Sequence, residues 1–125
     1  MAAAPEGVDE RIRAAYATGD LTGLGALLAA DARWGDDSHP NRCCGRDDVL
    51  RTFSDWLGHG VTAEVLDTDT GPLGVACRLR VHWADPADRP RGIEFFHVFM
   101  LRDGLIAEIR RYNDVRSAKH AITKA

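Results

Sequence analysis

The sequence predicts an α+β fold, a cone-shaped barrel in which three N-terminal helices pack on a strongly curved, mainly antiparallel sheet. Residues 8–57 mostly repeat their apolar positions at the three- and four-residue spacing of helices, whereas residues 61–114 mostly alternate apolar and polar positions, as strands do. The length of 125 residues suits one domain with one core. Because a bent sheet closed by helices has an open end, we expect a pocket there.

The first two helices are expected on either side of a short turn. Residues 8–18 carry an apolar helical face made of Val8, Ile12, Ala15 and Tyr16. Thr18-Gly19-Asp20 should end this helix and begin the next, because glycine suits a helix end and aspartate suits an N-cap. The second helix has a buried stripe formed by Leu21, Leu24, Leu27 and Leu28.

A short strand, a loop and a third helix should follow. Residues 31–34 are the expected strand, and residues 35–45 form a loop rich in Gly, Asp, Pro and Asn. Residues 46–57 resume the helical period, with an apolar face of Val49, Leu50, Phe53, Trp56 and Leu57. Asp47 and Asp48 fall in the first turn of this helix, where the helix dipole stabilises negative charge, so they need no chemical role.

Four strands are expected after Gly60, at residues 61–67, 73–83, 93–102 and 105–114. An Asp103-Gly104 turn joins the last two. The strand at 73–83 points Val75, Cys77, Leu79, Val81 and Trp83 inward and Arg78, Arg80 and His82 outward. Residues 8–114 thus form the single domain, between a disordered N-terminus of residues 1–7 and a C-terminal tail of residues 115–125.

Composition argues against several function classes. The net charge is −3 and no dense basic stripe is present, so nucleic acid is not an expected partner. No apolar run is long enough for a membrane span and no leader pattern opens the chain, so we expect a cytoplasmic protein without a membrane partner. The three cysteines include the adjacent Cys43 and Cys44 and lack a C-x-x-C spacing. We therefore expect no disulfide framework, no metal site and no cofactor.

Three segments, taken in order, resemble a known family. They are AYATGDLTGLGALLAADARWGDD at residues 15–37, GRDDVLRTF at residues 45–53 and HVFMLRDGLIAEIRRYND at residues 97–114. Together they resemble the SnoaL-like and ketosteroid-isomerase-like branch of the nuclear-transport-factor-2-like superfamily. The resemblance implies the cystatin-like cone with an internal pocket. That superfamily includes isomerases, cyclases, dehydratases, epoxide hydrolases and non-catalytic binders, so the fold does not determine the function.

The resemblance implies three catalytic candidates. Asp36 falls where ketosteroid isomerases carry their general base, and His97 falls where they carry a protonated aspartate of the oxyanion hole. Ile12 replaces the tyrosine of that hole, although Tyr16 lies one helical turn further along the same face. Arg111 falls where SnoaL-like cyclases and limonene-epoxide-hydrolase-like enzymes carry a catalytic aspartate.

The facing of the last strand has two alternatives, because a slip of one residue reverses every side chain. The resemblance favours Ile109, Arg111 and Asn113 inward, and the alternative turns Arg110, Tyr112 and Asp114 inward. With the favoured facing, the side chains expected to line the pocket are mostly apolar: Tyr16, Trp34, Phe53, Val75, Cys77, Leu79, Val81, Trp83, Phe95, Phe99, Ile109 and Asn113. Such a lining suits a small hydrophobic molecule.

These residues predict acid/base chemistry that needs no cofactor. Asp36 would move a proton, His97 would polarise a carbonyl or accept the proton, and Arg111 would hold the developing negative charge. Isomerisation, cyclisation or dehydration of a small carbonyl compound would follow. Two alternatives stay open. One is a non-catalytic binder of a small hydrophobic ligand, in which the same three residues are structural, and the other is a homodimeric interaction module with a vestigial pocket.

A homodimer is expected through the outer face of the sheet. Phe96, Val98 and Met100 would form an apolar strip there. Such a strip is unfavourable in water unless a second subunit covers it.

Overall fold

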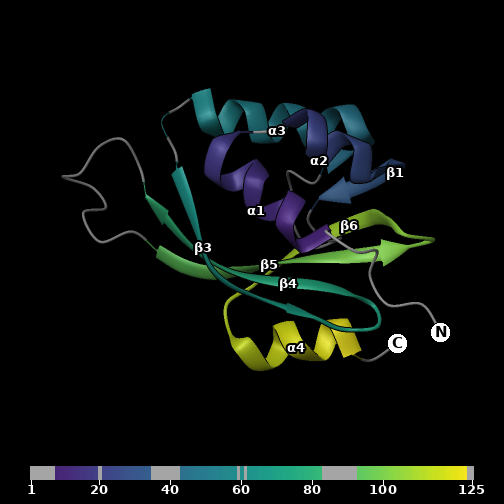
Figure 1. Ribbon diagram of the computed structural model, residues 1–125, viewed down its shortest axis with the longest axis vertical. Helices are drawn as coiled ribbons and strands as arrows, with labels where there is room; N and C mark the ends of the chain where they lie inside the picture. The colour runs from purple at the N-terminus through teal and green to yellow at the C-terminus, as the bar shows by residue number, and fades with distance from the viewer. Residues whose placement is uncertain are drawn as a thin grey trace.

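The computed structural model describes residues 8–19, 21–34, 43–58, 60, 62–82 and 93–123. These residues form four helices and one six-stranded sheet. In chain order the elements are α1 (Val8–Thr18), α2 (Leu21–Leu27), β1 (Leu28–Trp34), β2 (Cys43–Cys44), α3 (Arg46–Gly58), β3 (Thr62–Thr70), β4 (Gly74–His82), β5 (Ile93–Arg102), β6 (Leu105–Tyr112) and α4 (Val115–Thr123). Figure 1 shows α1, α2 and α3 on one face of the curved sheet and α4 on the other. No helix within the described ranges is long and apolar enough to cross a membrane.

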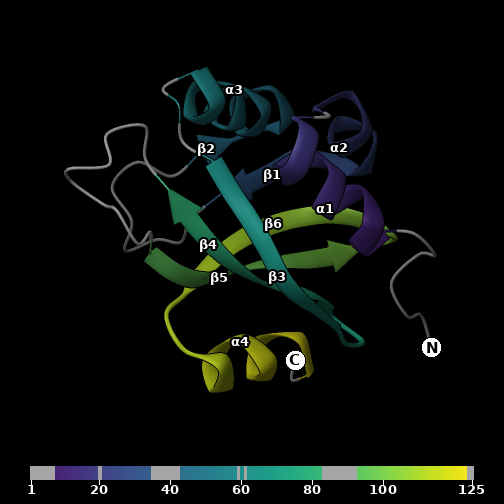
Figure 2. The ribbon, with the colours of Figure 1, turned by 60° about the vertical axis from the view of Figure 1, so that its left-hand side comes forward.

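The predicted mixed α+β class is confirmed, and the strand order is β2-β1-β6-β5-β4-β3. Strands β3 to β6 form an antiparallel meander, whereas β1 pairs with β6 in parallel. The pairing changes register between Val65 and Asp67 and again between Met100 and Leu101. Irregularities of this kind bend a strand and increase its twist. Figure 2 shows the strongly curved sheet from another side.

Strand β1 begins earlier than predicted. Leu28 opens the strand, where it pairs with Ile106 of β6, and does not belong to the leucine stripe of α2. The run from Leu27 to Ala29 is buried and apolar, a pattern that suits a helix or a buried strand equally well. Pairing with a strand far along the chain decides between them. Cys43, expected in a loop, pairs with Trp34 as part of the short strand β2.

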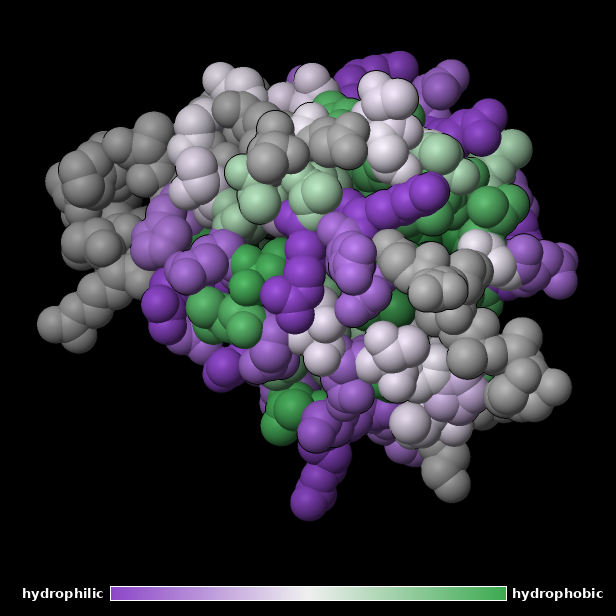
Figure 3. Space-filling model, viewed as in Figure 1, coloured by the Kyte–Doolittle hydropathy of each residue, from purple (hydrophilic) through white to green (hydrophobic). Residues whose placement is uncertain are grey.

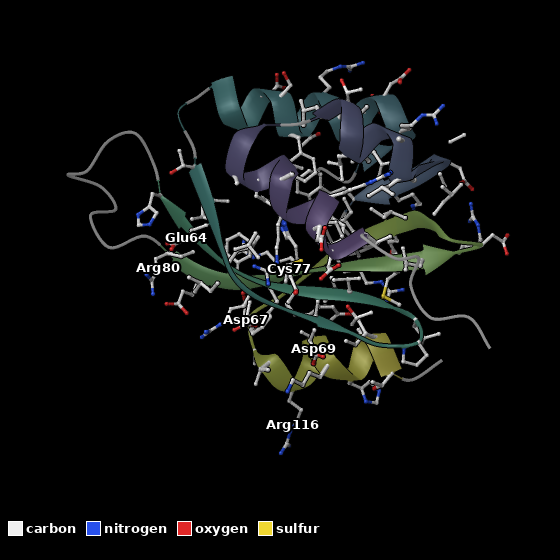
Figure 4. All side chains as sticks on the ribbon, viewed as in Figure 1. Glu64, Asp67, Asp69, Cys77, Arg80 and Arg116 are labelled. Atoms are coloured by element: carbon white, nitrogen blue, oxygen red, sulfur yellow. The ribbon has the colours of Figure 1, made fainter. Side chains whose placement is uncertain are left out.

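The two faces of β4 are as predicted. Its inner side chains are fully buried: Val75, Cys77, Leu79 and Val81. On the outer face, Arg78 pairs with Asp67 at 3.0 Å and Arg80 pairs with Glu94 at 2.9 Å. Figure 4 labels Arg80 and Asp67 on this part of the molecule. Exposed ion pairs stabilise a fold little, but they leave the face without net charge at these positions.

The favoured facing of β6 is the one observed. Ile109 pairs with Phe99 and Arg111 pairs with His97, so both lie on the inner face. The Asp103-Gly104 turn fixes this register, since both residues have positive φ, 54° and 81° respectively. Positive φ at both central positions is typical of the two-residue hairpin turn that aspartate and glycine favour.

Residues after Asp114, expected to be a tail, form α4 instead. Ser117 donates its backbone N–H to Asp114 Oδ1 at 2.7 Å, which caps the start of the helix. Helix α4 packs on the outer sheet face and makes a second apolar cluster, which contains Ala76, Phe96, Val98, Ala118, Ala121 and Ile122, with Met100 and Tyr112 packed against it. The strip that suggested a homodimer is therefore covered by the chain itself. Dimerisation remains a proposal, but without this support.

Gly71→Ala should destabilise the protein by about 1–3 kcal/mol, the usual cost of overpacking. A Cβ at Gly71 would lie 2.6 Å from the carbonyl oxygen of Ile122, at the C-terminal end of α4. That oxygen belongs to the backbone, so the clash can be relieved only by separating the end of α4 from the turn between β3 and β4. Denaturant unfolding measures the loss, and amide hydrogen exchange should show α4 losing protection first.

Gly58→Ala is the matched control, because a Cβ at this last residue of α3 meets no atom within 4 Å. Alanine should be neutral there or stabilise the helix slightly. An equal loss in both variants would contradict the close approach at Gly71.

Candidate functional site

One titratable imidazole lies within the apolar inner core. The core between the sheet and α1 to α3 contains Ile12, Leu24, Val49, Leu79 and Phe99 among many others. His97 is 2% exposed and faces this core from the middle of β5. Figure 3 shows that apolar side chains reach the visible face only as separate patches between hydrophilic ones. A polar group at such depth is stable only when it has a hydrogen-bond partner.

Tyr16 of α1 supplies that partner. Its hydroxyl oxygen lies 2.5 Å from Nδ1 of His97, and the two residues are 81 positions apart in the sequence. The helical period explains the placement, because Ile12 and Tyr16 lie one turn apart on the buried face of α1, and Ile12 is fully buried in the core. Tyr16 is itself only 6% exposed. The structure thus joins two of the predicted site residues directly.

Aromatic rings surround this pair. The ring of Trp34 lies 5.3 Å from that of His97, centroid to centroid, and nearly perpendicular to it. The Phe95 ring lies at 5.1 Å and the Phe99 ring at 6.4 Å. Phe53 of α3 stacks against Trp34 at 4.5 Å and contacts Tyr16 edge-on at 5.4 Å. Among the described residues, the structure therefore brings five predicted aromatic residues together with His97: Tyr16, Trp34, Phe53, Phe95 and Phe99.

Burial controls the protonation of both partners. Desolvation first, and the positive charge of Arg111 second, together lower the pKa of His97 to about 3. Desolvation also raises the pKa of Tyr16 well above its usual value. Near neutral pH both groups are therefore uncharged. When the Tyr16 hydroxyl donates to Nδ1, the imidazole proton lies on Nε2 and makes that atom a hydrogen-bond donor.

Arg111 lies at the solvent-exposed edge of the same group of residues. Its guanidinium carbon is 4.1 Å from the centroid of the Phe95 ring, a cation–π geometry, and its backbone is directly opposite His97. The side chain is exposed, and no carboxylate of the described residues forms an ion pair with it. The field of this cation reaches His97, as its effect on the imidazole pKa shows.

Most of the other predicted lining residues are core residues of the same inner face, and Cys77 of β4 is directly opposite His97. Cys77 packs in the core with Val75, Leu79, Val81 and Ile109, and all five have 0% exposure. Burial raises the pKa of the Cys77 thiol to about 12, so it stays protonated and unreactive. Asn113 follows the end of β6, is exposed, and lines a groove on the outer face rather than the inner core. Asp36 and Trp83 lie outside the described residues.

Tyr16→Phe should cost about 1–3 kcal/mol of unfolding free energy, because it leaves Nδ1 of His97 buried without its partner. Tyr112→Phe is the matched control on the outer face. There the phenol accepts a long 3.5 Å bond from Arg110 and is only half-buried, so water can replace the bond. Denaturant unfolding at pH 7 compares the two. Equal losses would show that the Tyr16 bond contributes nothing specific.

The bond between Tyr16 and His97 is the feature that the sequence pattern left open. A tyrosine on the buried face of a helix was the available signal, because a buried phenol needs a hydrogen-bond partner. The pattern could not name His97 as that partner. Chemically, a neutral imidazole held by a phenol in an apolar site can donate a hydrogen bond to a carbonyl or enolate oxygen. Its low pKa makes it a weak base.

Comparisons with known proteins agree with this fold. Residues 10–109 match the family model of the SnoaL-like domain. None of the curated proteins compared with the sequence matches it significantly.

Several solved structures are similar. A Sinorhizobium meliloti protein assigned as a polyketide cyclase is 21% identical, with 82% of this chain and 91% of that chain covered and a TM-score of 0.66. A Kribbella flavida protein assigned as a ketosteroid isomerase is 19% identical, with coverages of 82% and 72% and a TM-score of 0.64. An LEH-like epoxide hydrolase of M. tuberculosis is 18% identical, with coverages of 91% and 85% and a TM-score of 0.61.

Identities this low show a shared fold alone. The family model, however, spans most of the chain, from the first turn of α1 to the middle of β6, and includes Tyr16 and His97. The chain therefore belongs to the SnoaL-like domain family.

Proposed function

We propose that this protein is a cofactor-independent isomerase, cyclase or dehydratase that acts by acid/base chemistry on a small hydrophobic carbonyl compound. The observation that carries the proposal is the buried, uncharged pair of Tyr16 and His97, with the Arg111 cation across the sheet ladder from it. An apolar, water-poor site strengthens a hydrogen bond to a developing oxyanion. The names of the similar solved structures, a cyclase, an isomerase and an epoxide hydrolase, support the same class of chemistry.

In the proposed reaction, each residue has one role. Nε2–H of His97 donates to the substrate carbonyl and stabilises the enolate, while Tyr16 keeps the imidazole in the tautomer that can donate. Asp36 removes the proton next to the carbonyl and returns it elsewhere on the substrate. Arg111, at the exposed edge, stabilises the negative charge that develops as the proton leaves. Because the pKa of His97 is lowered to about 3, His97 is a weak base, and the proposal gives that role to Asp36.

The second candidate is a non-catalytic binder of a small hydrophobic ligand. One feature of the described residues fits it, since Val75, Leu79, Val81 and Phe99 form an apolar wall beside His97 that supplies no acid or base group. In that case the bond between Tyr16 and His97 serves only to satisfy two buried polar groups. A homodimeric interaction module with a vestigial pocket is the third possibility proposed from the sequence.

Thermal unfolding in the presence of enone steroids, polyketide-like aromatics, terpene epoxides and fatty acids tests the proposal first. A ligand at a hundred times its dissociation constant should add about 2.7 kcal/mol of stability. We expect a saturable shift for one carbonyl-containing class, and no comparable shift in a Trp34→Ala variant, because Trp34 lies against both His97 and Phe53. Binding confined to the fatty acids, without turnover of any carbonyl compound, favours the binder. No shift with any compound contradicts both.

A further inference from the structure

A cavity lies on the side of the sheet opposite His97. It is a groove of about 610 Å³ between α4 and the strands β5 and β6, within the roughly 300–1,000 Å³ typical of small-molecule sites. Its floor is apolar and consists of Leu73, Met100 and Ala121. Polar and basic groups stand along its rim, among them Tyr112, Arg116 and His120. The chemistry proposed for the inner face uses none of these residues.

Backbone contacts hold the groove in shape. The N–H of Leu73 donates to the carbonyl of Ile122, and the carbonyl of Leu73 accepts from the N–H of Leu101, both at 2.9 Å. Gly71 allows the end of α4 to approach the turn before β4 closely. The Asp114 cap fixes the other end of the helix. Because one end of α4 is bonded to the turn before β4 and the other is capped directly after β6, a ligand would not have to order the groove when it binds.

The charged side chains that line the groove are all basic. Other basic residues of the outer face have acidic partners: Arg110 contacts Glu108 at 2.8 Å and Lys119 contacts Asp69 at 3.9 Å. Arg116 forms no ion pair with any residue that the structure describes, and Figure 4 shows its side chain extending from α4 into solvent. No acidic side chain lines the groove. Hydrogen bonds from Ser117 and then the charge of Arg116 lower the pKa of Asp114. That carboxylate is bonded to Ser117 and does not line the groove, so an incoming anion meets a cation that is not held in an ion pair by the described residues.

Tyr112 adds a hydrogen-bond donor beside this cation. Its hydroxyl oxygen accepts a bond from Arg110 at 3.5 Å, and the salt bridge to Glu108 holds the Arg110 guanidinium. The phenolic proton of Tyr112 is thereby directed away from Arg110 and can be donated to an acceptor in the groove. An apolar floor, one cation and one neutral donor together fit a molecule with an apolar body and one negative group.

We propose that this groove binds a small amphipathic carboxylate. The apolar body lies on Leu73, Met100 and Ala121, and the carboxylate is held by Arg116 and Tyr112. This site is separate from the one around His97 and does not depend on the proposed reaction.

The probe is 2-naphthoate, compared with its neutral analogue 2-naphthylmethanol, in a two-dimensional NMR titration of the full chain. We expect saturable amide shifts centred on Tyr112, Ser117 and Ala121. Arg116→Gln should weaken the binding of 2-naphthoate by up to about fivefold, which corresponds to the free energy of a partly exposed ion pair. The same variant should leave the affinity for 2-naphthylmethanol unchanged. Lys119→Gln is the matched control, because Lys119 is also exposed on α4 but lines a different groove.

Ala121→Leu fills the floor and should abolish binding of both probes, with circular dichroism and unfolding confirming that the variant folds. The proposal is overturned if shifts centre on His97 and Tyr16, if Arg116→Gln and Lys119→Gln have equal effects, or if no shift saturates. It is also overturned if sedimentation shows that Ala121→Leu converts a dimer to a monomer, since a second copy would then fill the groove. Should Ala121→Leu fail to fold, the comparison of the two probes in Arg116→Gln still decides.

Discussion

Below pH 6.5, the wild-type protein should lose unfolding free energy faster than a His97→Gln variant, by about 1.4 kcal/mol for each pH unit. The folded protein holds the pKa of His97 at about 3, through burial first and the Arg111 charge second, whereas the ordinary value is 6.5. Between these two pH values, the His97 imidazole is protonated in the unfolded chain but not in the folded protein. Stability from this group is therefore complete above pH 6.5 and is lost progressively as the pH falls toward 3.

Denaturant unfolding at pH 7, 6, 5 and 4 measures the two slopes. Glutamine is the right replacement because its side-chain oxygen can still accept the Tyr16 hydroxyl and its amide does not titrate. Carboxylates with a lowered pKa, such as Asp31, Glu94 and Asp114, also make the protein less stable in acid. Their contribution is the same in both proteins. Only the difference in slope reports on His97. Parallel curves would mean that the imidazole is reached by water in the folded protein.

The contribution of Arg111 to this effect can be isolated with an adjacent control. Arg111→Gln should raise the pKa of His97 toward its usual value, because the second cause of the depression is gone. Arg110→Gln should not, since Arg110 lies on the opposite face and its charge is paired with Glu108. NMR titration of the labelled imidazole reads the pKa directly in each variant. An equal change in both would attribute the effect to net charge rather than to position.

The second large effect is expected on turnover. With a substrate identified by the ligand panel, Asp36→Asn should lower kcat by about a hundredfold to ten-thousandfold, the usual contribution of a positioned base. His97→Ala should lower it by about a hundredfold to a thousandfold, the usual contribution of one oxyanion donor. His97→Gln should recover part of that loss, because its amide can donate as well as accept.

Asp37→Asn is the matched control for the base, since it removes the same charge one position along the same segment. It should leave kcat within a few-fold of wild type. If Asp37→Asn reduces turnover as much as Asp36→Asn, the segment acts through its overall charge and Asp36 is not the base. If both Asp36→Asn and His97→Ala retain full turnover and remain folded, the acid/base mechanism is wrong.

Much of the fold followed from local pattern. The alternation in β4 identified the four side chains that are now fully buried and the arginines that face outward. The Asp103-Gly104 pair identified the hairpin and hence the register that places Arg111 opposite His97. These features are local because side-chain direction in a strand has a period of two, and because few turns accept two residues with positive φ.

Helix α4 and the start of β1 did not follow from local pattern. The segment from Val115 to Thr123 has only Ala118, Ala121 and Ile122 as buried residues, too few to distinguish a helix from a tail. The residue that begins this helix is a common N-cap, because Asp114 accepts the backbone N–H of Ser117. An isolated helix of this length is marginal in water, so its stability comes from the sheet face on which it packs.

The sequence by itself determined the α+β class, the face of each central strand and the apolar surroundings of His97, because each depends on the chemistry of neighbours along the chain. Tertiary structure alone decided that Tyr16 is the partner of His97, that the imidazole is uncharged, and that α4 covers the outer strip and forms a groove beside it. Each of these depends on the distance between residues far apart in sequence, and on the removal of water from between them. The spacing of residue types along the chain encodes neither that distance nor the removal of water.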